Sequence, residues 1–189
     1  MKPKDTKDRI ARATIELVAE CGIDAVSMRD IARVVNVSEA AIYKHFANKN
    51  ELIWEVFTTQ YDLFAGRLSE IQSRHDRFTA KLTAMVEDCC RLFDEDCDLF
   101  VFLLVAQHIQ RFAPKDFEAA MPAMLTALLD EAVLRGELPS QNAEATAAMV
   151  MGCVIQTALF CLYYKPTPKL MTPLSGELAA ACRRIVQGE

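Results

Sequence analysis

Residues 27–52 of the chain read SMRDIARVVNVSEAAIYKHFANKNEL, and this segment is the most informative about the fold. It contains two short helical patterns separated by a turn of about three residues. The small residue Ala32 lies where the helices must cross closely, the turn residue Asn36 follows four positions later, and the apolar Ile42 comes ten positions after Ala32. A helix-turn-helix needs this order of a tight crossing, a bend and a buried anchor on the second helix. The spacing therefore predicts a helix-turn-helix near the N-terminus.

Three apolar stripes are each preceded by a polar residue that can accept a hydrogen bond from the first turn of a helix. These capping residues are Ser27, Ser38 and Asn48. Asp30 and Glu51 each follow one of these caps by three residues, which completes a capping-box pattern. Asn36 ends the first of these helices, because Asn enters the left-handed conformation more readily than most residues. We therefore expect a helix between Ser27 and Asn36, a short one over about 38–46, and a longer one over about 48–73.

The rest of the chain is also helical in pattern. A first helix over about 6–21 ends before Gly22, which can take a positive φ. Pro122 falls inside one of the later helices, which therefore is kinked or begins later. Lys165 to Pro173 contains three prolines and is expected to be a loop. The later helices are expected over about 77–94, 97–112, 115–135, 141–164 and 174–187, so the fold class is all-α.

The charge of the chain is unevenly distributed. The net charge of the 189 residues is −5, which by itself argues against nucleic acid. Residues 1–50 carry nine Lys or Arg and seven Asp or Glu, whereas the remainder carries twelve and nineteen. The first fifty residues alone are thus suited to meet phosphate. Their basic residues cluster at Lys2, Lys4, Lys7, Arg9, Arg12, Lys44 and Lys49.

These motifs resemble the TetR family of bacterial regulators. The matching segments are ECGIDAVS at 20–27, SMRDIARVVNVS at 27–38 and AAIYKHFANKNEL at 40–52. The most specific part is the arrangement Tyr-x-His-Phe-x-x-Lys, which begins at Tyr43 and ends at Lys49. The resemblance covers roughly residues 6–65, and the rest of the chain agrees with the family only in length and helicity.

The resemblance implies that ten residues contact DNA. Ser27 and Arg29 would meet the backbone, with Arg29 also within reach of a base. The second helix of the motif leaves a slim face for the major groove, made of Ser38, Glu39, Ala40, Ala41 and Lys44. Tyr43, His45 and Lys49 would hold phosphates, and Ile42 and Phe46 would be core. Family members usually have Gly where this chain has Asn36, and often where it has Ala40, which leaves the operator sequence open.

The resemblance also implies a domain organisation. A three-helix DNA-binding domain over 1–50 would be followed by an effector-binding and dimerisation domain over 51–189, with the helix at about 48–73 as the link. The last two helices, rich in Ala and carrying Gly152 and Gly176, would form a four-helix interface in a homodimer. The effector is expected to be small and apolar or amphipathic. Candidate effector-binding residues are Gln107, His108, Arg111, Gln156 and Phe160.

Seven cysteines, odd in number and scattered, indicate free thiols in a reducing cytosol. Cys89, Cys90 and Cys97 lie close in sequence, but there is no Cys-x-x-Cys pair and no His at ligand spacing. Three interpretations stay open: a metal site, a redox switch, and ordinary packing of thiols as small apolar groups. Packing is the preferred interpretation, so no metal and no cofactor is expected.

The favoured function is a cytoplasmic regulator that binds double-stranded operator DNA as a repressor and is released by its effector. An alternative is a co-regulator that keeps the fold but acts through protein partners. An enzyme is the third possibility, but no catalytic triad pattern, phosphate loop or metal signature is present in the sequence. The apolar run from Ala145 to Tyr164 is interpreted as a buried helix, so no contact with a membrane is expected.

Overall fold

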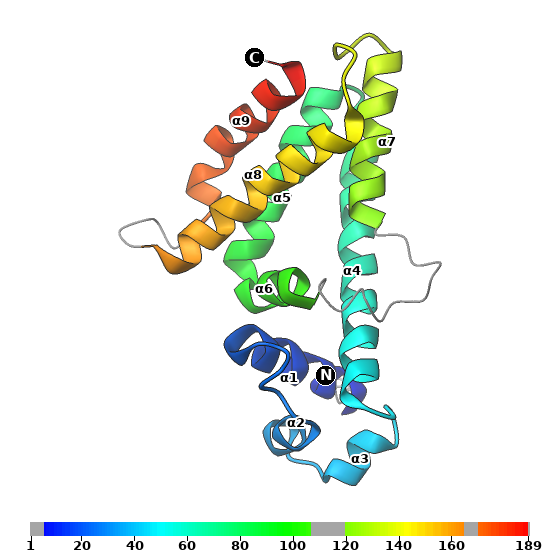
Figure 1. Cartoon of the computed structure of the whole chain (residues 1–189), viewed down its shortest axis with the longest axis vertical. Helices are drawn as coiled ribbons and strands as arrows, with labels where there is room; N and C mark the ends of the chain where they lie inside the picture. Colours follow the sequence, from blue (N-terminus) through cyan, green and yellow to red (C-terminus); the bar gives the residue numbers. More distant parts are fainter. Residues whose placement is uncertain (1–5, 107–119, 165–169, 189) are drawn as a thin grey trace. The chain divides into compact units, whose positions relative to one another are not determined.

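A computed structural model describes residues 6–106, 120–164 and 170–188 of the chain. Within these residues the secondary structure is helical, which confirms the all-α prediction (Figure 1). The helices are α1 (Thr6–Cys21), α2 (Met28–Val35), α3 (Glu39–Tyr43), α4 (Lys49–Ser73), α5 (Phe78–Glu95), α6 (Cys97–Ala106), α7 (Ala120–Leu134), α8 (Ala143–Tyr163) and α9 (Ser175–Gln187), with a 3-10 turn over Thr172–Leu174.

Helix α2 is bounded by the two residues that the sequence indicates. The Ser27 hydroxyl accepts a hydrogen bond from the Asp30 amide, and the Asp30 carboxylate accepts one from the Ser27 amide, so the capping box is complete. Asn36 takes the left-handed conformation, with φ 57° and ψ 52°, and its amide bonds back to the end of α2. Both predicted boundaries of this helix are confirmed.

Helix α3 is shorter than the pattern predicts. It covers Glu39–Tyr43, whereas the expected helix extends to about residue 46. The backbone amides of His45 and Phe46 both donate to the carbonyl of Ile42, so the chain turns there before α4 begins. The Asn48 side chain then accepts from the Glu51 amide at 2.9 Å, as its capping role predicts.

The chain divides into two compact units. The first comprises residues up to Leu63 together with Asp96–Phe117, and the second comprises Phe64–Glu95 together with Glu118–Glu189. Helix α4 contributes to both units. The first unit also includes α6, which packs against α1, so this unit is not continuous in sequence. The predicted boundary between domains at residue 50 does not coincide with this grouping. It stays a prediction about which residues serve DNA binding and which serve effector binding.

In the first unit α1 packs against α2 and α6, and α2 packs against α3. Ile42 and Phe46, expected in the core, are 0% and 2% exposed. The other fully buried large side chains of this unit are Ile10, Ile31, Leu52, Ile53, Phe57 and Phe102. The short helices α2 and α3 are therefore held by an apolar core that α1, α4 and α6 complete. Leu63 of α4, by contrast, is 64% exposed although it is a large apolar residue.

In the second unit α5 packs against α8 and α9, and α7 packs against α8. Pro122 is the third residue of α7, a position that has no need of a backbone donor, so the helix tolerates it. The most apolar window of helix α8 has a mean hydropathy of 1.9, and only 33% of that window is buried in the single chain, so α8 is not the buried helix that the sequence predicts. By length and composition it is the one helix in the described ranges that matches a membrane span, which alone is weak evidence for one.

Candidate nucleic-acid interface

Eight of the ten predicted DNA-contacting residues have exposed side chains in the first unit. Ala41 and Lys49 are half-buried. The eight exposed residues are Ser27, Arg29, Ser38, Glu39, Ala40, Tyr43, Lys44 and His45. They come from the start of α2, the cap of α3, α3 itself and the turn that follows it.

Helix α3 has one apolar face and one accessible face. Ile42 is fully buried and anchors the helix to the first unit. Its other residues are small or polar, and Tyr43 has 49% of its surface exposed although it is an aromatic residue. A buried anchor with a slim outward face is what a helix needs to enter the major groove, which is about 12 Å wide.

The start of α2 is fixed by electrostatics as well as by its cap. The Ser27 hydroxyl lies 2.5 Å from the Asp30 carboxylate, and this hydrogen bond holds the pKa of Asp30 below its usual value. The carboxylate also accepts from Arg33 at 2.8 Å. An anionic residue in the first turn is favourable, because the N-terminus of a helix carries partial positive charge.

Most basic residues in the described part of the first unit are occupied by intramolecular contacts. Lys7 pairs with Glu55 at 2.5 Å. Arg12 bonds Glu16 at 2.7 Å and Asp96 at 2.6 Å. Burial by itself would lower the pKa of Arg12, but the hydrogen bonds to Glu16 and Asp96 raise it overall. The side chains of Arg29 and Lys44, by contrast, are exposed and make no hydrogen bond or ion pair with the described part of the chain, although the charge of Arg29 contributes to the lowered pKa of Asp30.

Lys49 does not point away from the protein as the other predicted phosphate ligands do. Its ammonium group lies 3.0 Å from the carbonyl of Ile23 and 2.9 Å from that of Val26. The carbonyl of Asp24 is 3.5 Å away. The sequence pattern identified Lys49 as a residue of interest, but the pattern cannot distinguish a contact with phosphate from a contact with the main chain.

The predicted effector-binding residues are not brought together among the residues described. Gln107, His108 and Arg111 lie outside the described residues. Gln156 and Phe160 are exposed on α8, and the Phe160 ring stacks on Tyr164 with ring centroids 4.6 Å apart. The two side chains are therefore on an outward face of α8.

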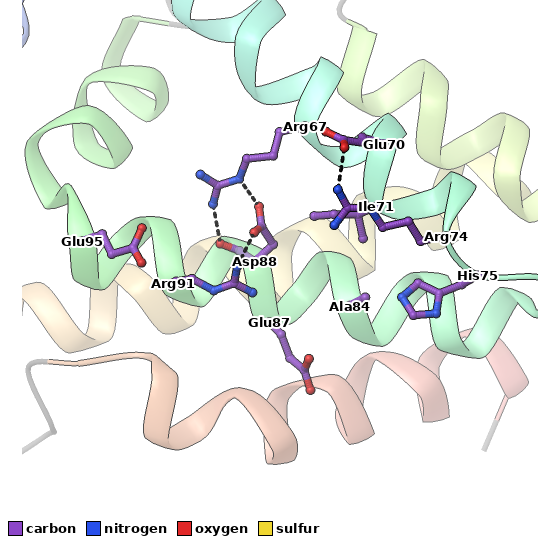
Figure 2. Close-up of a pocket in the computed structure, with 10 residues that line it drawn as sticks. All are labelled: Arg67, Glu70, Ile71, Arg74, His75, Ala84, Glu87, Asp88, Arg91 and Glu95. Atoms are coloured by element: carbon purple, nitrogen blue, oxygen red, sulfur yellow. Dashed lines mark hydrogen bonds and ion pairs between the residues drawn. The ribbon is translucent and has the colours of Figure 1, made fainter.

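A cleft of about 420 Å³ lies in the second unit, and neither Gln156 nor Phe160, the two predicted effector residues that the structure describes, lines it. Figure 2 shows charged side chains from α4 and α5 gathered around it. Its residues are Arg67, Glu70, Ile71, Arg74, His75, Ala84, Glu87, Asp88, Arg91 and Glu95.

Asp88 is the central group of this cleft. Its side chain is 2% exposed and accepts from Arg67 at 2.5 Å and from Arg91 at 3.2 Å (Figure 2). The Arg67 guanidinium donates also to the main-chain carbonyl of Asp88 at 3.3 Å. The sequence analysis did not identify this cluster. The signal was an acidic residue on the inward face of an otherwise apolar stripe in α5.

None of the seven cysteines forms a disulfide. Desolvation by burial raises the pKa of Cys90 to about 11 and the pKa of Cys89 and Cys182 to about 12. Cys182 also makes a side-chain hydrogen bond with Cys153. No group of three or more His, Cys, Asp or Glu suited to a metal ion occurs in the parts of the chain that the structure covers.

Comparison with known proteins finds a family match for the N-terminal part of the chain. The family model for "Bacterial regulatory proteins, tetR family" matches residues 10–56. A putative mycofactocin biosynthesis transcriptional regulator, MftR of Mycobacterium tuberculosis, is 35% identical over 69 residues, which is 36% of this chain and 35% of that protein. An uncharacterized HTH-type transcriptional regulator, YvdT of Bacillus subtilis, is 24% identical and spans 82% of this chain and 84% of its own length.

The similarity in fold extends over almost all of the chain. The crystal structure of the transcriptional regulator FadR from Bacillus subtilis, in complex with stearoyl-CoA, matches with a TM-score of 0.77 at 18% identity. That match covers 96% of this chain and 98% of FadR. Residues 10–56 thus match the TetR family in sequence, and the fold is similar to that of TetR-family regulators.

Sequence similarity to the TetR family is concentrated in one part of the molecule. The matched residues 10–56 include α2, α3, most of α1 and the start of α4, and all ten predicted DNA-contacting residues fall within them. The cleft and helices α5 to α9 lie outside the matched segment. The relatives named here are transcriptional regulators, not enzymes.

Proposed function

We propose that this protein is a sequence-specific DNA-binding transcriptional regulator. The observation that carries the proposal is the outward face of α2 and α3, where Arg29, Tyr43, Lys44 and His45 are all exposed beside the small residue Ala40. Hydroxyl, ammonium and imidazole donors hold phosphate oxygens, and small side chains allow α3 close approach to base edges. Base contacts would come from Arg29 and the α3 face.

The regulator acts as a homodimer in the cytoplasm. Two recognition helices must reach successive major grooves, so their separation must be about 34 Å. Helix α8 supports the proposal of a homodimer because it leaves apolar and small residues exposed in a single chain. These residues, spaced along one side of the helix, are Ala145, Met149, Gly152, Phe160 and Tyr163.

Gly152 gives a direct test of the dimer. A Cβ atom built at Gly152 meets nothing within 4 Å in the single chain, and Gly66 on α4 has the same open surroundings. G152L should therefore leave the fold intact and convert the dimer to a monomer, whereas G66L should remain dimeric. Sedimentation velocity distinguishes these outcomes. A dimer that persists in G152L contradicts the proposed interface.

We further propose that the protein represses transcription and that a small apolar or amphipathic effector releases it from DNA. FadR, which has a similar fold, was crystallised with stearoyl-CoA, an amphipathic molecule. Helix α4 supplies residues to both units, so it is one of the covalent connections through which a ligand of the second unit would act on the first. Such coupling typically changes DNA affinity by about 5–150-fold.

The decisive experiment measures binding of the full chain to a random DNA duplex at low salt, followed by selection of operators from genomic fragments. The double substitution Tyr43→Ala and Lys44→Met should reduce affinity by about tenfold or more, because both donors lie on the proposed interface. Arg77→Met removes an exposed charge from the second unit and should bind as the unmodified protein does. If the folded protein does not bind duplex DNA at low salt, the proposal fails and the co-regulator alternative replaces it.

A further inference from the structure

The seven basic residues of the described first unit fall into two groups. Arg29 and Lys44 point outward and make no hydrogen bond or ion pair with the described chain. The others contact the protein itself, three of them through acidic side chains: Lys7, Arg12 and Arg33. The remaining two, Arg9 and Lys49, instead donate to main-chain carbonyls. These two are the subject of the inference.

Lys49 has its donors directed at the segment between α1 and α2. An ammonium group has three N–H donors and no acceptor, and three carbonyls, those of Ile23, Asp24 and Val26, lie 2.9–3.5 Å from its nitrogen. Lys49 is the first residue of α4, so its side chain joins the start of α4 to the segment that leads into α2. A lysine in this environment has no donor left over for a phosphate oxygen.

Arg9 makes the matching contact at the other end of α2. Its guanidinium donates to the carbonyl of Val35, the last residue of α2. Asn36 follows in the left-handed conformation and starts the turn into α3. Helix α2 is thus held at its start from α4 and at its end from α1.

We infer that Arg9 and Lys49 are positioning residues, which we call the carbonyl clamp, and that neither contacts DNA phosphate. The clamp fixes α2 and the turn after it against α1 and α4, and so sets the direction in which α3 presents Tyr43 and Lys44. The role of Lys49 in DNA binding is therefore indirect. The DNA-binding test of this inference rests on the proposed function, whereas the measurements of Tm and of lysine reactivity in the free protein do not.

The salt dependence of DNA binding separates a positioning role from a phosphate contact. Each phosphate neutralised by a cation contributes about 0.9 to the slope of log affinity against log salt, so one contact per subunit contributes about 2 in a dimer. K49M keeps most of the aliphatic stem but removes the donors. We expect K49M to leave the slope unchanged, to lower affinity by a similar factor at every salt concentration, and to lower the Tm of the free protein by about 5 °C.

K44M is the matched control, because Lys44 lies five residues earlier and is exposed. It should leave the Tm unchanged and reduce the slope by about 2. If K49M behaves as K44M does, with a reduced slope and an unchanged Tm, then Lys49 is a phosphate ligand and the inference is overturned.

A measurement on the unmodified protein covers the case in which K49M fails to fold. Reductive methylation followed by mass spectrometry compares the two amines directly. Lys49 should react at least about tenfold more slowly than Lys44 in the free protein, because its donors are held by carbonyls. Added duplex should protect Lys44 and leave the rate at Lys49 unchanged. Equal rates at the two lysines in the free protein would overturn the clamp, whereas failure of the protein to bind duplex would overturn only the proposed function.

Discussion

The two units of this chain are stabilised by different means. In the first unit α2 has 8 residues and α3 has 5, whereas α5 and α8 in the second unit have 18 and 21. Short helices are unstable alone, because a turn costs more to nucleate than a few hydrogen bonds return. The first unit therefore depends on side chains that satisfy main-chain groups, among them Ser27, Ser38 and Lys49. The second unit also has such contacts, for example the Asn142 cap of α8, but its longer helices bury more apolar residues along their length.

This difference bears on how function is assigned. In the first unit many polar residues are needed to build the helix-turn-helix, so only part of its positive charge is available to a ligand. The position of a basic residue beside such a motif therefore does not show that the residue contacts DNA. Arg29 and Lys44 differ from Lys49 in their surroundings, not in their residue class.

The largest expected effect tests whether the two units unfold separately. Phe46 is 2% exposed in the first unit, and F46A should destabilise that unit by about 3–5 kcal/mol because a large cavity is left behind. Trp54, the single tryptophan of the chain, lies in the first unit and reports on it alone. In urea, Trp fluorescence of F46A should change well before the circular dichroism of the whole chain does.

F78A is the matched variant, since Phe78 is equally buried in the second unit. It should leave the fluorescence transition in place and advance only the later part of the dichroism change. If fluorescence and dichroism shift together in both variants, the chain unfolds as one cooperative body and the contrast between the units has no energetic meaning.

The next effect concerns the one buried charge cluster of the described second unit. D88A removes the carboxylate that Arg67 and Arg91 share, and should lower the free energy of unfolding by about 2 kcal/mol. The loss is smaller than for a fully buried pair because both arginines are partly solvated. The D88N variant keeps the shape of the Asp88 side chain but removes its charge, so it separates the effect of the charge from that of the shape. If urea denaturation gives equal stability for D88A and the unmodified chain, the cluster contributes nothing to the fold.

The sequence predicts features that depend on residues close together in the chain, and it does not predict features that depend on residues far apart. The boundaries of α2 were predicted because Ser27, Asp30 and Asn36 act on residues within a turn of themselves. The inclusion of α6 in the first unit was not predicted, because packing between α1 and α6 joins residues about ninety positions apart. The same holds for Lys49, whose type and spacing match the family while its partners, 23 to 26 residues away, are visible only in the fold.

A smaller effect tests the turn of the helix-turn-helix. Asn36 has φ 57°, a conformation that glycine adopts freely and alanine does not. N36A should lower the free energy of unfolding by about 1 kcal/mol, and N36G should be neutral within about 0.5 kcal/mol. Urea denaturation monitored by Trp54 measures both. Equal stability of the two variants would mean that the turn does not impose this backbone conformation in solution.

The smallest expected effect is chemical rather than energetic, and it contrasts thiols of the two units. Cys21 is exposed in the first unit, whereas Cys182 is fully buried in the second. Burial raises the pKa of Cys182 to about 12, so almost none of it is thiolate at pH 8. Iodoacetamide followed by peptide mass spectrometry should therefore label Cys21 and leave Cys182 unmodified in the native protein, with both labelled in urea.

The same burial predicts how stability changes with pH. A thiol whose pKa is higher in the folded state than in the unfolded chain stabilises the fold fully below about pH 9, and that stability is lost as pH rises toward 12. Ionisation of Cys182 should leave the urea midpoint of unfolding unchanged across neutral pH and lower it above pH 9. In the C182A variant the urea midpoint should fall less steeply above pH 9. Rapid labelling of Cys182 at pH 8 would instead mean that the second unit opens readily. Its thiols would then be accessible to oxidants, and packing would no longer account for them.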